Sequence, residues 1–213
     1  SMFAISACSS GAVDVGAQPS VSVIEPGHVV TDSPTPAPSS ASTSSDSQCL
    51  RSFRPTAGDA SSAAVAAIRQ RGKLIVGVAQ DEYLTGYLDA SGNETGFDVD
   101  VAKQVEQAIF GSQDPKYIKF KAVTNAQRIT ALQAKDPADA VDMVVDTFTI
   151  NCQRAQQVLF SSVYYNAHQR LLVLKNSGYR GLGDLGGKKV CAQAGSTSLQ
   201  TILGYPSRPV AYA

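Results

Sequence analysis

Two side chains that could hold a carboxylate, Thr149 and Arg154, follow an apolar run at residues 141–145. The run has the length of a buried strand, and the polar residues after it indicate a strand end that opens into a loop and a helix start. Open α/β sheets bind ligands outside the carboxyl ends of their strands, where the N–H groups of a following helix attract anions. A guanidinium adds two coplanar donors that match a carboxylate. The pattern therefore predicts carboxylate binding, and its alternative is a solvated Arg154 beside a strand-end Thr149.

A second group of candidate residues follows another apolar run, at residues 73–78. Asp81 could pair with an ammonium group, and Tyr83 and Tyr87 could form the walls of a pocket. The same residues are equally typical of a surface turn. Both interpretations stay open on this stretch alone.

Hydrophobic periodicity predicts the elements that position these groups. Three helices are expected, at 62–71, 97–109 and 125–133, and they alternate with three strands, at 73–78, 117–121 and 141–145. Gly72 and Gly111 would end the first two helices, and Asp98 would cap the second. Such alternation is typical of an α/β fold, in which a parallel sheet carries helices on both faces.

The composition excludes several function classes. The 213 residues carry 18 basic and 18 acidic side chains, so the zero net charge gives no reason to bind nucleic acid. No stretch approaches the roughly 18 consecutive apolar residues of a membrane-spanning helix. Two histidines, His28 and His168, cannot form a His-rich metal site, and residues 183–189 lack the spacing of a phosphate-binding loop. No cofactor, metal or nucleic acid is therefore expected.

The N-terminal residues predict export and lipid attachment. Residues 1–8 resemble the end of a lipoprotein signal with its lipobox, in which Cys8 carries the lipid, although a chance run of small residues before a cysteine is the alternative. Residues 9–60 are rich in Ser, Pro and Thr and cannot bury enough apolar surface to fold. We interpret them as a disordered tether, so that the folded part begins near residue 61.

A series of motifs extends from about residue 61 to residue 200. They are Lys73-Leu-Ile-Val-Gly-Val78, Gly96-Phe-Asp-Val-Asp-Val-Ala102, Arg128-Ile-Thr-Ala-Leu132, Val141-Asp-Met-Val-Val145 with Thr149 and Arg154, Phe160-Ser161 with Tyr164-Tyr165, and Gly187-Lys-Lys-Val190 with Gly195-Ser-Thr197. In this order they resemble the extracytoplasmic solute-binding proteins of polar amino-acid ABC transporters. The glutamine- and glutamate-binding lipoproteins of actinobacteria are the most similar group.

The resemblance implies a type II periplasmic-binding-protein fold, in which two α/β lobes joined by two hinge strands close on an amino acid. Residues 61–165 would form the first lobe. Residues 166–213 would form the hinge crossing, with a strand at 168–174, and part of a second lobe that starts with a strand at 188–192. A second lobe of ordinary size needs more residues than these, so the sequence predicts an incomplete second lobe.

The resemblance also implies a set of ligand-binding residues: Asp81, Tyr83, Arg128, Thr147, Thr149, Arg154, Gln193 and Thr197. Thr149 and Arg154 would bind the α-carboxylate of the ligand, and Asp81 would meet its ammonium group. Arg128 would meet a side-chain carboxylate, and its alternative is a helix residue that points to solvent. Gln193 and Thr197 would be the contribution of the second lobe.

The implied protein is a receptor anchored by its lipid to the outside of a bacterial cell membrane. It would bind glutamate, aspartate or glutamine and deliver it to an ABC permease or a membrane sensor, without catalysis. The alternative is an enzyme of the same fold, such as a cyclohexadienyl-type dehydratase. Such an enzyme needs a general acid, for which Asp81, Glu82 and Asp146 are the candidates.

The cysteines of an exported chain are expected to form disulfides. We predict a bond between Cys49, at the end of the tether, and Cys152, after the binding strand, because it would join the start of the folded region to the first lobe. Cys191 would then lack a partner in this chain. A bond between Cys152 and Cys191, and a thiolate pair of Cys152 with His168, are the alternatives.

Peptide mapping under non-reducing conditions tests this pairing. We expect a fragment in which Cys49 is joined to Cys152. A fragment that joins Cys152 to Cys191 instead would show the assignment to be wrong.

Overall fold

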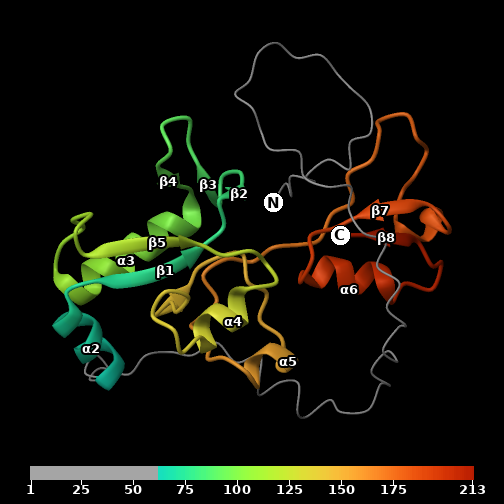
Figure 1. Cartoon of the computed structure of the whole chain (residues 1–213). Helices are drawn as coiled ribbons and strands as arrows, with labels where there is room; N and C mark the ends of the chain where they lie inside the picture. Colours follow the sequence, from blue (N-terminus) through green and yellow to red (C-terminus); the bar gives the residue numbers. More distant parts are fainter. Residues whose placement is uncertain (1–61) are drawn as a thin grey trace. The chain divides into compact units, whose positions relative to one another are not determined.

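The structure, a computed structural model, describes residues 62–213, which divide into two compact units at residues 62–166 and 167–213. The lipidation site predicted at Cys8, the tether and Cys49 lie outside the described residues. Figure 1 shows the first unit in teal through green and yellow to orange, and the second in orange to red.

A three-stranded parallel sheet forms the centre of the first unit. Its strands are β1 (Leu74–Val78), β5 (Ile118–Ala122) and β6 (Met143–Val144), in the order β5-β1-β6. Val76 is paired with both Phe120 and Met143. Because β1 has a neighbour on each side, its backbone is satisfied within the sheet, and its apolar sequence is typical of a strand covered on both faces.

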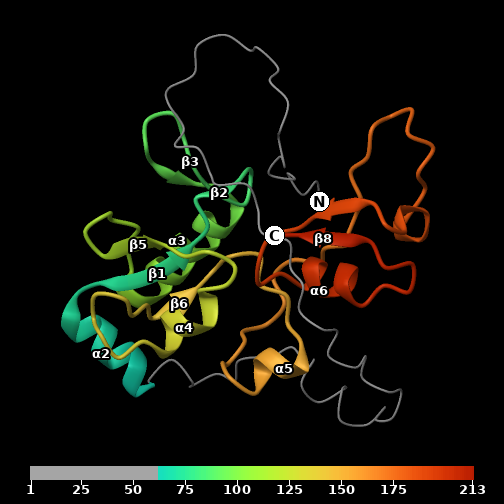
Figure 2. The same ribbon diagram turned by 45° about the vertical axis from the view of Figure 1, so that its right-hand side comes forward.

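Two helices cover one face of this sheet: α2 (Ala63–Arg71) and α3 (Phe97–Phe110). Leu74, Val76 and Val78 alternate along β1, point to the same face and form one buried cluster with residues of both helices, including Val99 of α3. The cluster is the core of the unit. The shorter helix α4 (Arg128–Gln133) contacts β6, and Figure 2 shows the two elements side by side.

The helix ends follow the predicted glycines but not the predicted acidic cap. Gly72 and Gly111 end α2 and α3 with left-handed φ values of 71° and 74°, as predicted. The N-cap of α3 is Gly96, however, and no side chain caps it. The prediction that Asp98 caps this helix is therefore wrong, and its carboxylate is used elsewhere.

A small antiparallel sheet follows β1, in the segment for which the sequence predicted either pocket walls or a surface turn. It consists of β2 (Asp81–Glu82), β3 (Gly86–Leu88) and β4 (Glu94–Thr95), with Asp81 opposite Tyr87. The polar and aromatic sequence of this segment hides its alternation because both faces carry polar groups. The sheet leads directly into α3.

Two predicted strands differ from the structure. The strand expected at 141–145 pairs only at Met143–Val144, since the side chain of Asp142 instead accepts the N–H of Ile75 at 2.7 Å and pairs with Arg71. The strand expected at 168–174 is absent, and these residues have no regular secondary structure. An apolar alternation without a neighbouring strand does not form a ladder.

The second unit contains a 3₁₀ helix, η2 (Leu182–Leu185), then β7 (Lys189–Cys191), α6 (Thr197–Leu203) and β8 (Val210–Tyr212). Figure 2 shows β8 beside α6, and β7 and β8 pair in parallel, as expected for a strand–helix–strand unit. Leu185, Val190, Leu199, Ile202 and Ala211 form its core. None of the helices in residues 62–213 has the length and apolar character needed to span a bilayer.

Gly96 allows the antiparallel sheet and α3 to approach each other closely. Its φ is +121°, and a Cβ built there would come within 2.3 Å of the Thr85 carbonyl oxygen. Backbone atoms cannot move away as a flexible side chain can. Gly92, in the turn between β3 and β4, also has a positive φ, of +81°, but a Cβ there meets nothing within 4 Å.

This difference predicts the effect of alanine at the two positions. Gly92→Ala should lower the free energy of unfolding by about 1 kcal/mol, the cost of left-handed backbone for a residue with a Cβ. Gly96→Ala should lower it by more than about 3 kcal/mol, because the same cost is added to a collision. Urea denaturation followed by circular dichroism measures both, and similar losses would contradict the close approach at Gly96.

Candidate functional site

The polar residues after β6 form a loop with an unusual backbone. Thr147 has a φ of +40°, in the left-handed region that a β-branched residue rarely adopts. Such a conformation persists only where neighbouring groups hold it, and it is concentrated at functional sites. The carboxyl end of β6 is therefore a candidate site by its geometry as well as by its sequence.

Two carboxylates hold Thr147. Its backbone N–H donates to Asp98 Oδ2 at 2.8 Å, and its hydroxyl donates to Glu82 Oε2 at 2.8 Å. The second oxygen of Asp98 accepts the hydroxyl of Tyr164 at 3.0 Å. Asp98 therefore connects α3 to the loop after β6, which explains why it does not cap its own helix.

Arg128 and Arg154 meet at the ring of Phe148. Their guanidinium carbons lie over this ring, at 4.3 Å and 4.4 Å from its centroid, and Phe160 packs against it with a centroid distance of 5.3 Å. Each cation over an aromatic face gains roughly 1 kcal/mol, and more where water is excluded. Phe148 thus fixes the planes of two cations that belong to different elements.

Backbone carbonyls complete the positions of both arginines. Arg128 donates from Nε to Asn125 O at 3.0 Å and from Nη1 to Asp146 O at 2.9 Å. Arg154, in α5 (Cys152–Ala155), donates from Nη1 to Thr149 O at 2.8 Å. Only 2% of Arg128 and 7% of Arg154 are exposed, so a solvated position is wrong for either residue.

Burial perturbs the charges at the site. Burial, and then the repulsion from Arg128, lowers the pKa of Arg154 to about 10, and burial also lowers the pKa of Arg128. Burial raises the pKa of Asp146 to about 8, although Arg128 opposes this shift with its Nε 3.9 Å from the carboxylate. Asp146 is fully buried, and neither carboxylate oxygen has a hydrogen-bond partner. Its neutral form is therefore the favoured one near neutral pH.

Asp81 and Tyr83 lie at the surface, and of the two only Asp81 acts on this network, where its charge adds to the raised pKa of Asp146. Both are exposed, Tyr83 at 65%, and the Tyr83 ring packs on that of Tyr87 with a centroid distance of 5.0 Å. The structure brings Glu82, not Asp81, to Thr147. Successive residues of a strand point to opposite faces, so the hairpin directs Glu82 and Asp81 to different sides. Because this hairpin was not predicted, the sequence analysis named Glu82 only as a candidate general acid.

Gln193 and Thr197 belong to the second unit and lie where β7 leads into α6. The Gln193 carbonyl accepts the N–H of Ser196 at 3.2 Å, and the Ser196 side chain caps α6 by accepting the N–H of Leu199 at 3.1 Å. Thr197 is the first residue of α6. Their contact with a ligand stays a prediction.

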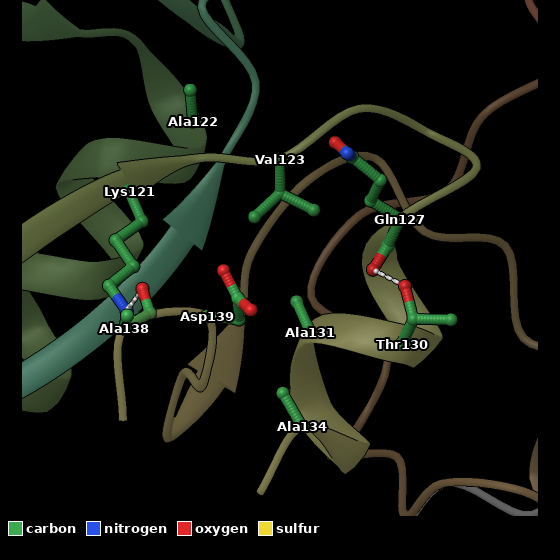
Figure 3. A pocket seen from close by; sticks show the side chains of 9 residues that line it. All are labelled: Lys121, Ala122, Val123, Gln127, Thr130, Ala131, Ala134, Ala138 and Asp139. Atoms are coloured by element: carbon green, nitrogen blue, oxygen red, sulfur yellow. Dashed lines mark hydrogen bonds between the residues drawn. The ribbon is translucent and has the colours of Figure 1, made fainter. Parts of the chain in front are cut away.

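A cavity of about 450 Å³ lies on the other side of α4, between this helix and β5 (Figure 3). The Lys121 side chain reaches from β5 to the backbone, where its ammonium group donates to three carbonyl oxygens, of Pro137, Ala138 and Ala140, at 2.7–3.1 Å. Small side chains such as Ala131 and Ala134 form much of the rest of the wall. None of the predicted ligand-binding residues lines this cavity, and its cation is already satisfied, so it is not the candidate site.

Metal chemistry finds no support in the described part of the chain, where no three His, Cys, Asp or Glu side chains are placed to hold an ion. Cys152 and Cys191 are both disulfide-bonded. The expectation that Cys191 lacks a partner in this chain is therefore wrong. The pairing of Cys152 with Cys49 stays a prediction.

The family model for bacterial extracellular solute-binding proteins, family 3, matches residues 74–203. The chain belongs to this family. The predicted family and the α/β fold of type II periplasmic binding proteins are therefore confirmed. The matched residues include Phe148, Phe160 and both arginines that pack on Phe148.

Named relatives are amino-acid-binding proteins. The chain is similar to the ABC transporter glutamine-binding protein GlnH of Bacillus subtilis, with 44% identity over 140 residues, which are 65% of this chain and 49% of that protein. It is 41% identical to the glutamine-binding protein of Geobacillus stearothermophilus over 137 residues, 63% of this chain and 50% of that protein. The chain thus spans about half the length of these curated relatives.

Solved structures agree on the fold. A mutant of the protein ArgBP from T. maritima superposes with a TM-score of 0.61 at 31% identity, covering 70% of this chain and 61% of that one. The ancestral amino acid-binding protein AncCDT-1, described as a precursor of cyclohexadienyl dehydratase, gives a TM-score of 0.62 at 30% identity, covering 69% and 63%.

The charge state of Asp146 predicts how stability depends on pH. The folded state retains a proton up to about pH 8, whereas the unfolded chain releases it near pH 4, so stability falls as pH rises between these values. Asp146→Asn cannot ionise and should lose this dependence. Between pH 5 and pH 8 the variant should therefore gain on the natural protein, at up to about 1.4 kcal/mol per pH unit.

Urea denaturation at pH 5, 6.5 and 8 measures this difference. Asp139→Asn is the matched control, because Asp139 is an exposed carboxylate of the same unit. Parallel pH curves for the natural protein and Asp146→Asn would contradict a neutral, buried Asp146.

Proposed function

We propose that this chain is an extracytoplasmic receptor that binds glutamate, aspartate or glutamine. The observation that carries the proposal is the pair of arginines held over Phe148 at the carboxyl end of β6. Two cations at this distance repel each other, and the lowered pKa of Arg154 expresses that repulsion together with burial. A ligand with two negative groups, or with one negative group and one carbonyl, would relieve it.

Each arginine is assigned one end of the ligand. Arg154 and Thr149 bind the α-carboxylate, because both belong to the loop and short helix that follow β6. Arg128, on α4, binds the side chain of the ligand, and Thr147, in the same loop as Thr149, is a further ligand-binding residue. The names of the relatives support this class of ligand, since they are glutamine-binding proteins and a glutamate-binding protein, GluB of Corynebacterium glutamicum, 32% identical over 137 residues.

Asp81 is assigned to the ammonium group of the ligand, and Tyr83 to the wall beside it. Both side chains are exposed in the described structure and accessible to solvent. Glu82 is already engaged by Thr147, so the neighbouring Asp81 is the carboxylate of β2 that can accept a new donor.

The receptor delivers its ligand to an ABC permease or a membrane sensor, and a lipid on Cys8 attaches it to the bacterial cell membrane. The family match and the ABC transporter named for the Bacillus subtilis relative support the partner. The sequence around Cys8 supports the anchor. Palmitate labelling of the expressed protein, lost in Cys8→Ser, tests it.

A catalytic role of the cyclohexadienyl-dehydratase type is the second candidate, and one observation favours it. Asp146 holds a proton near neutral pH, as a general acid must, and one structural neighbour is a precursor of such an enzyme. Asp146 is nevertheless fully buried and cannot reach a substrate without a rearrangement. Incubation with cyclic prephenate-like acids should show no turnover.

Calorimetry on the full-length protein tests the two arginine roles. Arg154→Ala should abolish binding of glutamate, aspartate and glutamine alike, because a desolvated carboxylate without its cation costs several kcal/mol. Arg128→Ala should weaken glutamate and aspartate more than glutamine. It is best made together with Asp146→Asn, because loss of Arg128 alone would also change the protonation of Asp146.

Two controls accompany these variants. Asp146→Asn alone reports the effect of the second change, and Lys119→Ala removes an exposed positive charge from β5 of the same unit. A preference of the natural protein for lysine or leucine would contradict the proposed ligand class. Equal weakening of all three ligands by the Arg128 change would contradict its role as the side-chain reader.

A further inference from the structure

Asp98 is a buried carboxylate whose two oxygens serve two different segments. Only 2% of the residue is exposed, yet it lies in the first turn of α3 rather than in the loop after β6. One oxygen accepts Thr147 N–H at 2.8 Å, and the other accepts Tyr164 O–H at 3.0 Å. The loop that carries the candidate site and the chain near residue 164 are therefore tied to one side chain.

The Thr147 end of this link holds a strained backbone. At a φ of +40°, Thr147 lacks the freedom that a glycine would have, so the conformation depends on the groups that hold it. Asp98 holds the backbone N–H, while Glu82 holds the hydroxyl. A charged acceptor binds an N–H more strongly than a neutral one does. Loss of the charge at Asp98 would therefore weaken this hold, and loss of the acceptor itself would remove it.

The Tyr164 end lies where the chain leaves the first unit. Tyr164 and Tyr165 pack on Phe97, next to Asp98, with centroid distances of 6.1 Å and 5.6 Å. The first unit ends at residue 166, so both tyrosines lie within two residues of its end. Removal of Tyr164 O–H would leave Asp98 with one donor fewer in a buried place.

We propose that Asp98 is a positioning residue that couples Tyr164 to Thr147, so that the segment leaving the first unit controls the conformation of the binding loop. When Tyr164 donates to Asp98, the carboxylate is fixed, and Thr147 is held in its left-handed conformation. When Tyr164 moves away, the hold on Thr147 weakens. The loop between β6 and α5 then loses the geometry that places Thr149 and Arg154.

The surrounding charges make the link sensitive to Tyr164. Burial raises the pKa of Asp98, the donors Thr147 N–H and Tyr164 O–H lower it, and the charge of Glu82 on β2 raises it. Asp146, after β6, also interacts with Asp98, while Arg128 on α4 faces Glu82 and Asp146. Loss of the Tyr164 hydroxyl should therefore raise the pKa of Asp98 further.

The first test needs no ligand. The amide resonance of Thr147 in ¹⁵N–¹H spectra should titrate with Asp98, and Tyr164→Phe should move its midpoint to higher pH. Tyr117→Phe is the matched control, because Tyr117 stacks on Phe110 at 4.8 Å, in a separate aromatic pair of the same unit, and should leave the midpoint unchanged. Asp98→Asn should abolish the titration. An unchanged midpoint in Tyr164→Phe would overturn the proposal.

The second test measures amino-acid affinity and rests on the proposed function. Tyr164→Phe should weaken binding roughly tenfold through faster dissociation, as expected for one hydrogen bond to a charged group. Asp98→Ala should weaken it more. Asp98→Asn should recover much of the loss, since an amide can accept Thr147 N–H and donate to the Tyr164 oxygen.

The two tests separate this proposal from the proposed function. If the natural protein binds no amino acid, the proposed function fails, whereas the Thr147 titration still decides the coupling. If it binds normally and Tyr164→Phe binds equally well, the coupling does not reach the binding loop and the proposal fails. Thermal unfolding of each variant shows whether it folds, and Tyr164→Phe, a loss of one oxygen, is the variant that perturbs folding least.

Discussion

The burial of two like charges beside one another is the constraint on which the site depends. Arg128 and Arg154 come from different helices, and each would be more stable alone in water than near the other in the protein. The structure offsets the cost with the face of Phe148 and with backbone carbonyls, of Asn125 and Asp146 for Arg128 and of Thr149 for Arg154. Because the backbone of the same loop supplies several of these contacts, the charges and the loop conformation depend on each other.

The neutral form of Asp146 fits this constraint. A fully ionised carboxylate at this position would cancel one arginine and leave the site with little attraction for an acid. A carboxyl group that favours its proton leaves the charge of Arg128 in place, while the backbone carbonyl of Asp146 holds the guanidinium. Glu82 and Asp98, by contrast, each accept a hydrogen bond from Thr147, so these two carboxylates hold the loop rather than pair with the arginines.

Sequence periodicity was sufficient for the core and for one side of the site. The apolar run that forms β1, the glycines that end α2 and α3, and the polar break after β6 each express a local rule, and all three hold in the structure. Asp98 shows where such rules end. Its place at the start of a helix favours a cap, but the carboxylate turns to a strained N–H that is remote in sequence, and no local pattern encodes that contact. The hairpin of β2 and β3 was missed for a similar reason, because its short strands become regular only through their pairing. Without this hairpin, the contact of Glu82 with Thr147 could not be predicted either.

The place of β1 has a consequence for the order in which the chain can fold as it is synthesised. This strand is the most apolar of the sheet and the first to emerge, but both of its partners come later, β5 only after the antiparallel hairpin and the whole of α3, and β6 after α4. Until then Leu74–Val78 is an unpaired hydrophobic segment, of the kind that associates with other chains. The sheet cannot close around this segment until residue 144 has been synthesised, so its folding waits on contacts that are distant in sequence.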